Sequence, residues 1–204
     1  MFIELIDLLR CTRPHEDSWL VAAFYDMRER DVIEGLLSCP VCNARYPITN
    51  GVAWFGVEPG TASPAAQALN ADGMAVAAYL GLVEPGVVLL GGGWADAADV
   101  LGGLGNTVIA FNSAEVASAA RVSRVRCDTI VPLARECLDG IALDTVEREL
   151  VESGARALKN GARMVAPAGA SVPPGLVELA RDESYWVAAR EGVSASAPVQ
   201  IARR

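Results

Sequence analysis

The chain has 204 residues, a formal net charge of −8 and 52% hydrophobic residues, so it can bury one or two globular cores. The negative charge argues against a protein that holds nucleic acid by bulk electrostatic attraction. RNA binding stays open only through a local basic patch, for which Arg10, Arg13 and Arg45 are the candidates.

Cellular location is predicted from the apolar runs and the cysteines. Gly, Asp or Glu interrupts every apolar run well before it could span a membrane, and Glu4 and Asp7 break the region where a signal peptide would lie. Five cysteines, an odd number, do not suggest a disulfide framework, and a Cys-x-x-Cys pair favours metal ligation in a reducing compartment. We expect a cytoplasmic protein without a membrane span.

Residues 1–57 contain two pairs of candidate metal ligands. Cys11 and His15 form the first pair, and Cys39 and Cys42 form the second in a tight Cys-Pro-Val-Cys turn. Two such pairs suit the tetrahedral coordination of a structural zinc ion, and a module this small needs the stability that a metal supplies. Three alternatives stay open: ordinary buried thiols beside a surface histidine, a redox Cys-x-x-Cys, and a catalytic zinc without an evident general base.

A short hairpin is predicted directly after the second ligand pair. Residues 46–48 are strand-like, Asn50 and Gly51 form a turn signal, and residues 52–55 are an apolar strand. Together with the Cys-x-x-Cys turn, this gives residues 1–57 the form of a small zinc-ribbon-like domain.

LIDLLRC (5–11) and SCPVCNARYPITNGVAWF (38–55) resemble the small zinc-ribbon proteins that activate methyltransferases of tRNA, ribosomal RNA and release factors. The family pattern is a leading helix that ends in LL-x-C-P-x-C, an insert, and then C-x-x-C-x-x-x-YPI-x-x-GIP. The first part departs from it, since CTRPH replaces CPxC and His15 stands where a cysteine is usual. The second part matches at Cys39, Cys42, Tyr46, Pro47, Ile48 and Gly51.

The resemblance also implies how the ribbon contacts a methyltransferase. In the activator family, apolar ribbon surface joins the edge of the partner's sheet by strand addition. By analogy, Val52, Trp54 and Phe55 would dock onto the second half of this same chain. The alternative is that these three side chains form the small core of the ribbon.

A linker and a helix entry are expected over residues 58–72, which are rich in Pro, Gly, Ser and Ala. Helical spacing of apolar residues runs over 65–83 and ends at a Pro-Gly turn. Residues 73–204 then alternate between strand-like and helix-like segments. Strands are expected over 87–92, 107–111, 127–133, 139–144 and 162–168, and helices over 94–104, 113–122, 145–160 and 174–181.

This alternation predicts an α/β fold for residues 73–204, namely a Rossmann-like, mostly parallel sheet with helices on both faces. The last two strand-like segments, SYWVAAR and APVQIAR, are expected to form an antiparallel hairpin at one edge of the sheet.

A glycine-rich turn, formed by Gly91, Gly92 and Gly93, lies between the first predicted strand and helix of this domain. Such a turn lets backbone amides approach a ligand closely, and tight packing of strand against helix is the alternative explanation. Asn112 ends the next strand, where it could bind a ribose hydroxyl only weakly because it is neutral.

The order of elements resembles the class I S-adenosylmethionine-dependent methyltransferases. That resemblance implies a cofactor site at Gly91, Gly92, Gly93 and Asn112, with Asp128 at the adenine ring. The chain departs from the family because Val88, Leu89 and Leu90 stand where an acidic residue usually precedes the glycines, and because no NPPY-like loop follows the fourth strand.

These features favour a non-catalytic zinc-binding scaffold, activator or complex subunit with a degenerate methyltransferase-like domain. A protein partner or a homodimer is expected for it. The alternative is an active S-adenosylmethionine-dependent methyltransferase that acts on RNA, protein or a small molecule.

Overall fold

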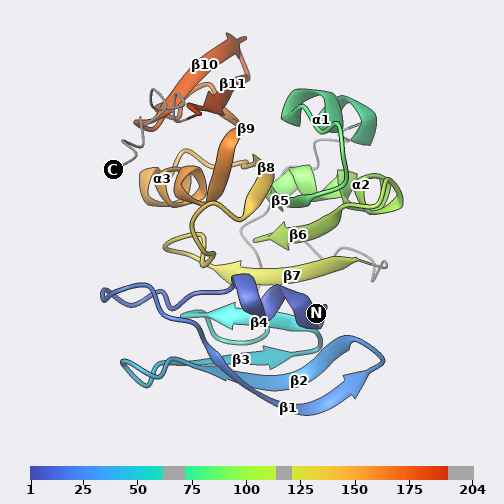
Figure 1. The fold of residues 1–204 in the computed structure, drawn as a ribbon, viewed down its shortest axis with the longest axis vertical. Helices are drawn as coiled ribbons and strands as arrows, with labels where there is room; N and C mark the ends of the chain where they lie inside the picture. The colour runs from blue at the N-terminus through green and yellow to red at the C-terminus, as the bar shows by residue number, and fades with distance from the viewer. Residues whose placement is uncertain (62–71, 114–120, 193–204) are drawn as a thin grey trace, which may run out of the picture.

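In the computed structural model, which describes residues 1–61, 72–113 and 121–192, the strands join into one sheet (Figure 1). The spatial order is β1-β2-β3-β4-β7-β6-β5-β8-β9-β11-β10. Its strands are β1 (Val21–Arg28), β2 (Asp31–Ser38), β3 (Arg45–Thr49), β4 (Val52–Phe55), β5 (Val87–Gly91), β6 (Thr107–Phe111), β7 (Val122–Cys127), β8 (Leu138–Ala142), β9 (Leu158–Pro167), β10 (Leu176–Arg181) and β11 (Tyr185–Arg190).

The centre of the sheet is parallel and both of its ends are antiparallel. Strands β4, β7, β6, β5, β8 and β9 are parallel neighbours, whereas β1 to β4 form an antiparallel meander and β10 and β11 form a hairpin on β9. Counted from β5, the order 3-2-1-4-5 is that of a doubly wound α/β sheet. The predicted fold class, a mostly parallel Rossmann-like sheet with helices on both faces, is confirmed.

Short helices cover both faces of this sheet. The 3-10 helix η1 and helix α3 pack on one face, where a single hydrophobic cluster extends from Leu5 and Phe55 to Leu150 and Trp186. A second cluster lies on the other face, beneath α1 and α2. The helical segments are η1 (Ile3–Leu8), α1 (Gly73–Leu80), η2 (Gly92–Ala97), α2 (Ala98–Gly103) and α3 (Arg148–Ala157).

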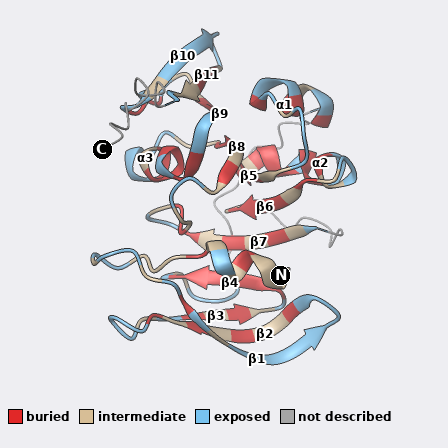
Figure 2. Cartoon of the chain, in the orientation of Figure 1, coloured by how far each residue is buried: buried red, intermediate tan, exposed pale blue. Residues whose placement is uncertain are grey.

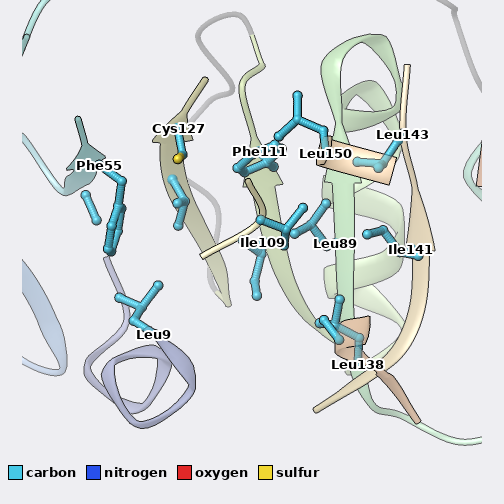
Figure 3. Close-up of a cluster of buried hydrophobic side chains, with 14 of the residues drawn as sticks. Leu9, Phe55, Leu89, Ile109, Phe111, Cys127, Leu138, Ile141, Leu143 and Leu150 are labelled. Atoms are coloured by element: carbon cyan, nitrogen blue, oxygen red, sulfur yellow. The ribbon is translucent and has the colours of Figure 1, made fainter. Parts of the chain in front are cut away.

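Figure 3 shows that the larger cluster crosses from the ribbon into the parallel sheet without a break: Leu9 and Phe55 are followed by Cys127, Ile109 and Leu89. Apolar side chains therefore connect the two halves, as does the backbone of the sheet. The division of the chain into a ribbon at 1–57 and a second domain at 73–204 stays a prediction.

Several predicted elements are confirmed and others need correction. The strands over 87–92, 107–111, 139–144 and 162–168 are present, with bounds that differ from the predicted ones by at most four residues. The third strand lies at Val122–Cys127 instead of 127–133, because buried side chains alternate there with half-buried arginines that masked its pattern. Of the helices predicted over 65–83 and 113–122, residues 65–71 and 114–120 lie outside the described part of the chain.

The C-terminal hairpin differs in its first strand. Of the residues predicted as a helix over 174–181, residues 176–181 form strand β10 instead, because their backbone groups pair with β11. Strand β11 contains the predicted SYWVAAR segment, while APVQIAR falls outside the described residues. Among the residues described, no helix has the length and apolar character needed to cross a membrane.

Candidate functional site

The four predicted metal ligands lie together at one end of the ribbon. Cys11 and His15 follow η1, and the Cys39–Cys42 turn connects β2 to β3. The turn is closed by hydrogen bonds from the Cys39 amide to the Ala44 carbonyl (2.9 Å) and from the Asn43 amide to the Cys39 carbonyl (3.0 Å). Asn43 adopts a left-handed backbone conformation (φ 57°), which an asparagine tolerates well. The structure thus brings both pairs into one cluster, as their spacing predicted.

Distances within the cluster suit a tetrahedral ion. The Sγ atoms of Cys11 and Cys42 are 3.6 Å apart, and Cys39 Sγ lies 3.4 Å from His15 Nε2. All four ligand atoms lie within 4.8 Å of one another. Zinc–sulfur bonds of about 2.3 Å and zinc–nitrogen bonds of about 2.0 Å give tetrahedral edges of about 3.7 Å and about 3.5 Å. The residues present therefore fit a zinc ion held by three thiolates and one imidazole.

Hydrogen bonds with neighbouring backbone groups favour the metal-binding forms of two of these ligands, Cys39 and His15. Burial acts to raise the pKa of the Cys39 thiol, but hydrogen bonds from the amides of Cys42 and Val41 outweigh it, and the pKa falls to about 6. The thiolate is the form that binds metal. His15 Nδ1 lies 2.6 Å from the Glu16 carbonyl oxygen, so an Nδ1–H donor leaves the Nε2 lone pair facing Cys39.

Tyr46 connects the cluster to the sheet, a role that the sequence motif alone did not reveal. Its hydroxyl lies 3.0 Å from Cys11 Sγ and accepts a hydrogen bond from the Thr12 amide at 3.2 Å. Burial, together with Cys11, raises the pKa of Tyr46 to about 12, so the phenol stays protonated and can donate to a thiolate. Its ring stacks on Phe55 at 4.5 Å between centroids.

We expect Tyr46→Phe to weaken zinc binding by about 10–100-fold while the fold survives, because the stacked ring remains and only the hydrogen bond to the ligand sulfur is lost. Competition with a chromophoric chelator measures this change. Tyr25→Phe, on exposed strand β1, is the matched control and should bind zinc like the wild type. Equal affinities for the wild type and Tyr46→Phe would show that the hydroxyl does not support the site.

The ribbon docks on the second half of its own chain through β4. Val52, Trp54 and Phe55 belong to this strand, which pairs in parallel with β7; Trp54 lies opposite Arg126 and Phe55 opposite Cys127. The expected intramolecular strand addition is confirmed. The alternative, that these side chains form the small core of the ribbon, also holds for Phe55, which is buried in the same cluster as Tyr46.

The glycine turn lies where the strand order reverses between β5 and β8, the position at which doubly wound sheets bind ligands. Neighbouring side chains pack closely against it. A Cβ atom on Gly91 would lie 2.9 Å from Leu143 Cδ2, and one on Gly92, whose φ is 61°, would lie 2.8 Å from Asp144 Cβ. Gly92 is therefore required by its left-handed backbone and by Asp144, whereas at Gly91 the close neighbour is the flexible end of a leucine side chain.

Trp94 follows this turn and is buried in the apolar cluster beneath α1 and α2. Its indole Nε1–H donates to the Leu143 carbonyl at 3.3 Å, and its ring meets the edge of Tyr185 at 4.9 Å. The indole thus contacts the residue that follows β8 and the first residue of β11.

Asn112 and Asp128, the other predicted cofactor residues, flank the ends of β6 and β7. The Asn112 side chain holds both backbone groups of Cys127: its Oδ1 accepts from the amide (2.9 Å) and its Nδ2 donates to the carbonyl (2.6 Å). Asp128 follows β7 and is exposed. The structure brings these residues near each other, and their role toward a nucleoside stays a prediction.

Two thiols lie away from the metal cluster. Cys127 is fully buried, as expected for a structural thiol, and Cys137 is partly buried. Burial raises the pKa of Cys137 to about 11, and its Sγ–H donates to the Ala134 carbonyl. The Cys137 thiol is therefore not activated as a nucleophile.

Sequence reasoning did not anticipate two adjoining cavities, of about 400 Å³ and about 340 Å³, between α3 and the connection from β9 to β10. Arg148, Glu152, Pro173 and Pro174 line both of them. Residues of the connection from β9 to β10 form one wall of both cavities, and α3 forms the other.

Comparisons with known proteins give structural neighbours only, since no protein-family model and no curated protein matches the chain. The first of these neighbours are methyltransferases. The 1,6-didemethyltoxoflavin-N1-methyltransferase of Burkholderia thailandensis is 12% identical, with a TM-score of 0.41 over 59% of this chain and 76% of that one. A methyltransferase from Mesorhizobium loti is 16% identical, with a TM-score of 0.38 over 58% and 64% of the two chains.

The 16S rRNA N2 G1207 methyltransferase of T. thermophilus is 16% identical, with a TM-score of 0.35 over 77% of this chain and 45% of that one. This chain spans less than half the length of most of the methyltransferases that it matches first. Such distant likenesses assign neither an activity nor a substrate.

Proposed function

We propose that this protein is a non-catalytic, zinc-stabilised scaffold or a subunit of a larger complex. In it, a zinc ribbon of the activator type is joined to a methyltransferase-like sheet that no longer binds the cofactor. The observation that carries the proposal is Trp94, which follows the glycine turn where the strand order reverses and donates to the Leu143 carbonyl. Val88, Leu89 and Leu90 supply no carboxylate before the glycines, so no acidic group of β5 would fix a nucleoside or an amino-acid moiety.

Zinc would be held by Cys11, His15, Cys39 and Cys42. Four protein ligands complete a tetrahedral shell and leave no position for a substrate or an activated water, which is the arrangement of a structural ion. The ion would supply folding energy to a small module and, through Tyr46 and Phe55, would hold β4 against β7. The ribbon would thus act as a permanent edge support for the parallel sheet.

Isothermal titration calorimetry with S-adenosylmethionine tests the loss of cofactor binding. We expect no measurable heat with zinc-loaded protein up to millimolar cofactor, while an active class I methyltransferase measured in parallel binds. Trp94→Phe, which keeps a ring at the site, serves to check that the negative result does not depend on one hydrogen bond. A dissociation constant in the micromolar range would overturn the proposal.

An active methyltransferase is the second candidate, and one observation favours it. The strand order and the left-handed Gly92 at the end of β5 are both retained. Gly91, Gly92, Gly93, Asn112 and Asp128 would then hold S-adenosylmethionine after Trp94 moves aside. A crystal structure of the complex in which Trp94 is displaced and the cofactor contacts these glycines would establish this candidate in place of the first.

A further inference from the structure

The cysteines of the metal cluster differ in how far solvent reaches them. Cys42 is exposed and Cys11 is partly exposed, whereas Cys39 is 1% exposed. Figure 2 shows the turn between β2 and β3, which contains Cys42, mainly in the colour of exposed residues. Accessible thiolates are the cysteines that oxidants attack first. A dissolved oxidant can therefore reach the sulfur of Cys42 but not that of Cys39.

Two of the cluster sulfurs already touch although their residues are far apart in the chain. The Sγ atoms of Cys11 and Cys42 lie 3.6 Å apart across a separation of 31 residues. A disulfide holds its sulfurs at about 2.0 Å, so they would have to approach by about 1.5 Å. Cys11 lies between η1 and β1, and Cys42 lies in the turn between β2 and β3, so neither residue belongs to a strand. Small movements of both segments can close the bond.

Cys39 is the competing partner for Cys42, because Cys-x-x-Cys pairs also form disulfides. Its sulfur accepts hydrogen bonds from two backbone amides of its own turn. A disulfide sulfur is a weak acceptor, so a bond between Cys39 and Cys42 would leave both amides poorly satisfied. Cys11 accepts one amide hydrogen bond at 3.5 Å, and the Tyr46 hydroxyl beside its sulfur also contacts Thr12 Oγ1 at 3.2 Å. Fewer hydrogen bonds are therefore lost when Cys42 joins Cys11.

We propose that Cys11 and Cys42 form a redox-active pair, which a peroxide converts into a disulfide with release of the zinc ion. The Cys42 thiolate attacks the peroxide, so an S–O bond forms, the O–O bond breaks and an alkoxide or hydroxide ion leaves. The Cys11 thiolate then attacks the sulfenic sulfur, so the S–S bond forms and hydroxide leaves. The two thiolates lose two electrons and the peroxide gains them, while zinc keeps its charge and both leaving ions take protons from the solvent.

Loss of zinc connects this pair to the sheet. The two remaining ligands, His15 and Cys39, do not complete the four-ligand shell of a structural zinc ion. The sulfur of Cys11 contacts Tyr46, whose ring stacks on Phe55 in β4. Oxidation would therefore act on the contacts that hold β4 beside β7. The release of zinc rests on the proposed function, whereas the disulfide needs only the two sulfurs.

Treatment of the zinc-loaded full chain with hydrogen peroxide tests the pair. We expect the intact mass to fall by about 2 Da for the two hydrogens lost, zinc to reach a metallochromic dye, and a thiol reductant with added zinc to reverse both changes. Trypsin cleaves after Arg28 and Arg30, so Cys11 lies in one peptide and the Cys39–Cys42 turn in another. The two peptides should become cross-linked, and fragmentation between Cys39 and Cys42 should assign the bond to Cys42.

Cys137→Ser is the matched control, because it removes a thiol outside the cluster and should give the same cross-link. Cys42→Ser should abolish the cross-link between the peptides. The proposal is overturned by a disulfide inside the Cys39–Cys42 peptide, by a cross-link that Cys42→Ser leaves in place, or by a cluster that stays reduced while glutathione in the same solution is oxidised. A cross-link in protein that binds no zinc would support the disulfide and contradict the proposed zinc site, so the two failures are distinguishable.

Discussion

Removing the metal is expected to lower the melting temperature of the protein by about 10 °C or more, because several kcal/mol of metal-linked folding energy are lost and about 1 kcal/mol corresponds to 2–4 °C in a chain of this size. Cys39→Ser should have the same effect as a chelator. Hydrogen exchange should rise in β3 and β4, because Tyr46 of β3 contacts Cys11 and stacks on Phe55 of β4, and zinc should restore the protection.

Calorimetric melting and elemental analysis measure this effect. Cys137→Ser is the control, because this thiol lies outside the cluster and donates only to a backbone carbonyl, which a hydroxyl can also do. The variant should keep one zinc per chain and a melting temperature close to that of the wild type. The proposed structural zinc site would be contradicted if protein purified without chelators contained no transition metal and if adding a chelator left its melting temperature unchanged.

Phe55→Ala is expected to cost about 3–5 kcal/mol of unfolding free energy, the range for removing a large buried aromatic side chain. Phe55 is 1% exposed, stacks on Tyr46 and lies in the strand that joins the ribbon to β7. The cavity would therefore open where the two halves of the chain meet (Figure 3). Zinc affinity should fall as well, since Tyr46 loses the ring that positions its hydroxyl beside Cys11.

Urea unfolding followed by far-UV circular dichroism measures this loss. Phe24→Ala removes the same side chain from the exposed edge strand, where it is 39% accessible, and should cost less than about 1 kcal/mol in the monomer. If the two variants were equally stable, Phe55 could not be the contact that holds the ribbon on the sheet.

The parallel pairing of β4 with β7 forms within one chain, over four residue pairs. Covalent connection removes the entropy cost of association, so a contact of this size can suffice where a complex of separate chains would need a larger interface.

Much of the central sheet could be predicted because its strands are buried on both faces. Residues 87–91 and 107–111 are continuous apolar runs, the pattern of inner parallel strands, and both were located correctly. The Asn50-Gly51 turn was also correct, since both residues have the positive φ angles (51° and 72°) that a tight hairpin requires.

Edge strands were less predictable. The β1–β2 hairpin turns at Glu29 and Arg30, a pair without the usual Gly or Asn signal, although Glu29 has a φ of 55°. β10 carries a helix-like spacing of apolar residues and becomes a strand only because β11 offers it a backbone ladder. At an edge, few buried side chains mark the strand period, so the pairing partner decides the conformation.

The sequence by itself determined which atoms could bind a metal and which turn holds two of them, because ligand chemistry and tight turns depend on residues close together in the chain. Only the tertiary structure decided that His15 lies 3.4 Å from the Cys39 sulfur, that β4 joins β7, and that the Trp94 indole bonds to the Leu143 carbonyl. These contacts connect residues 24 to 72 positions apart, and their geometry follows from the packing of the whole sheet and not from any local pattern.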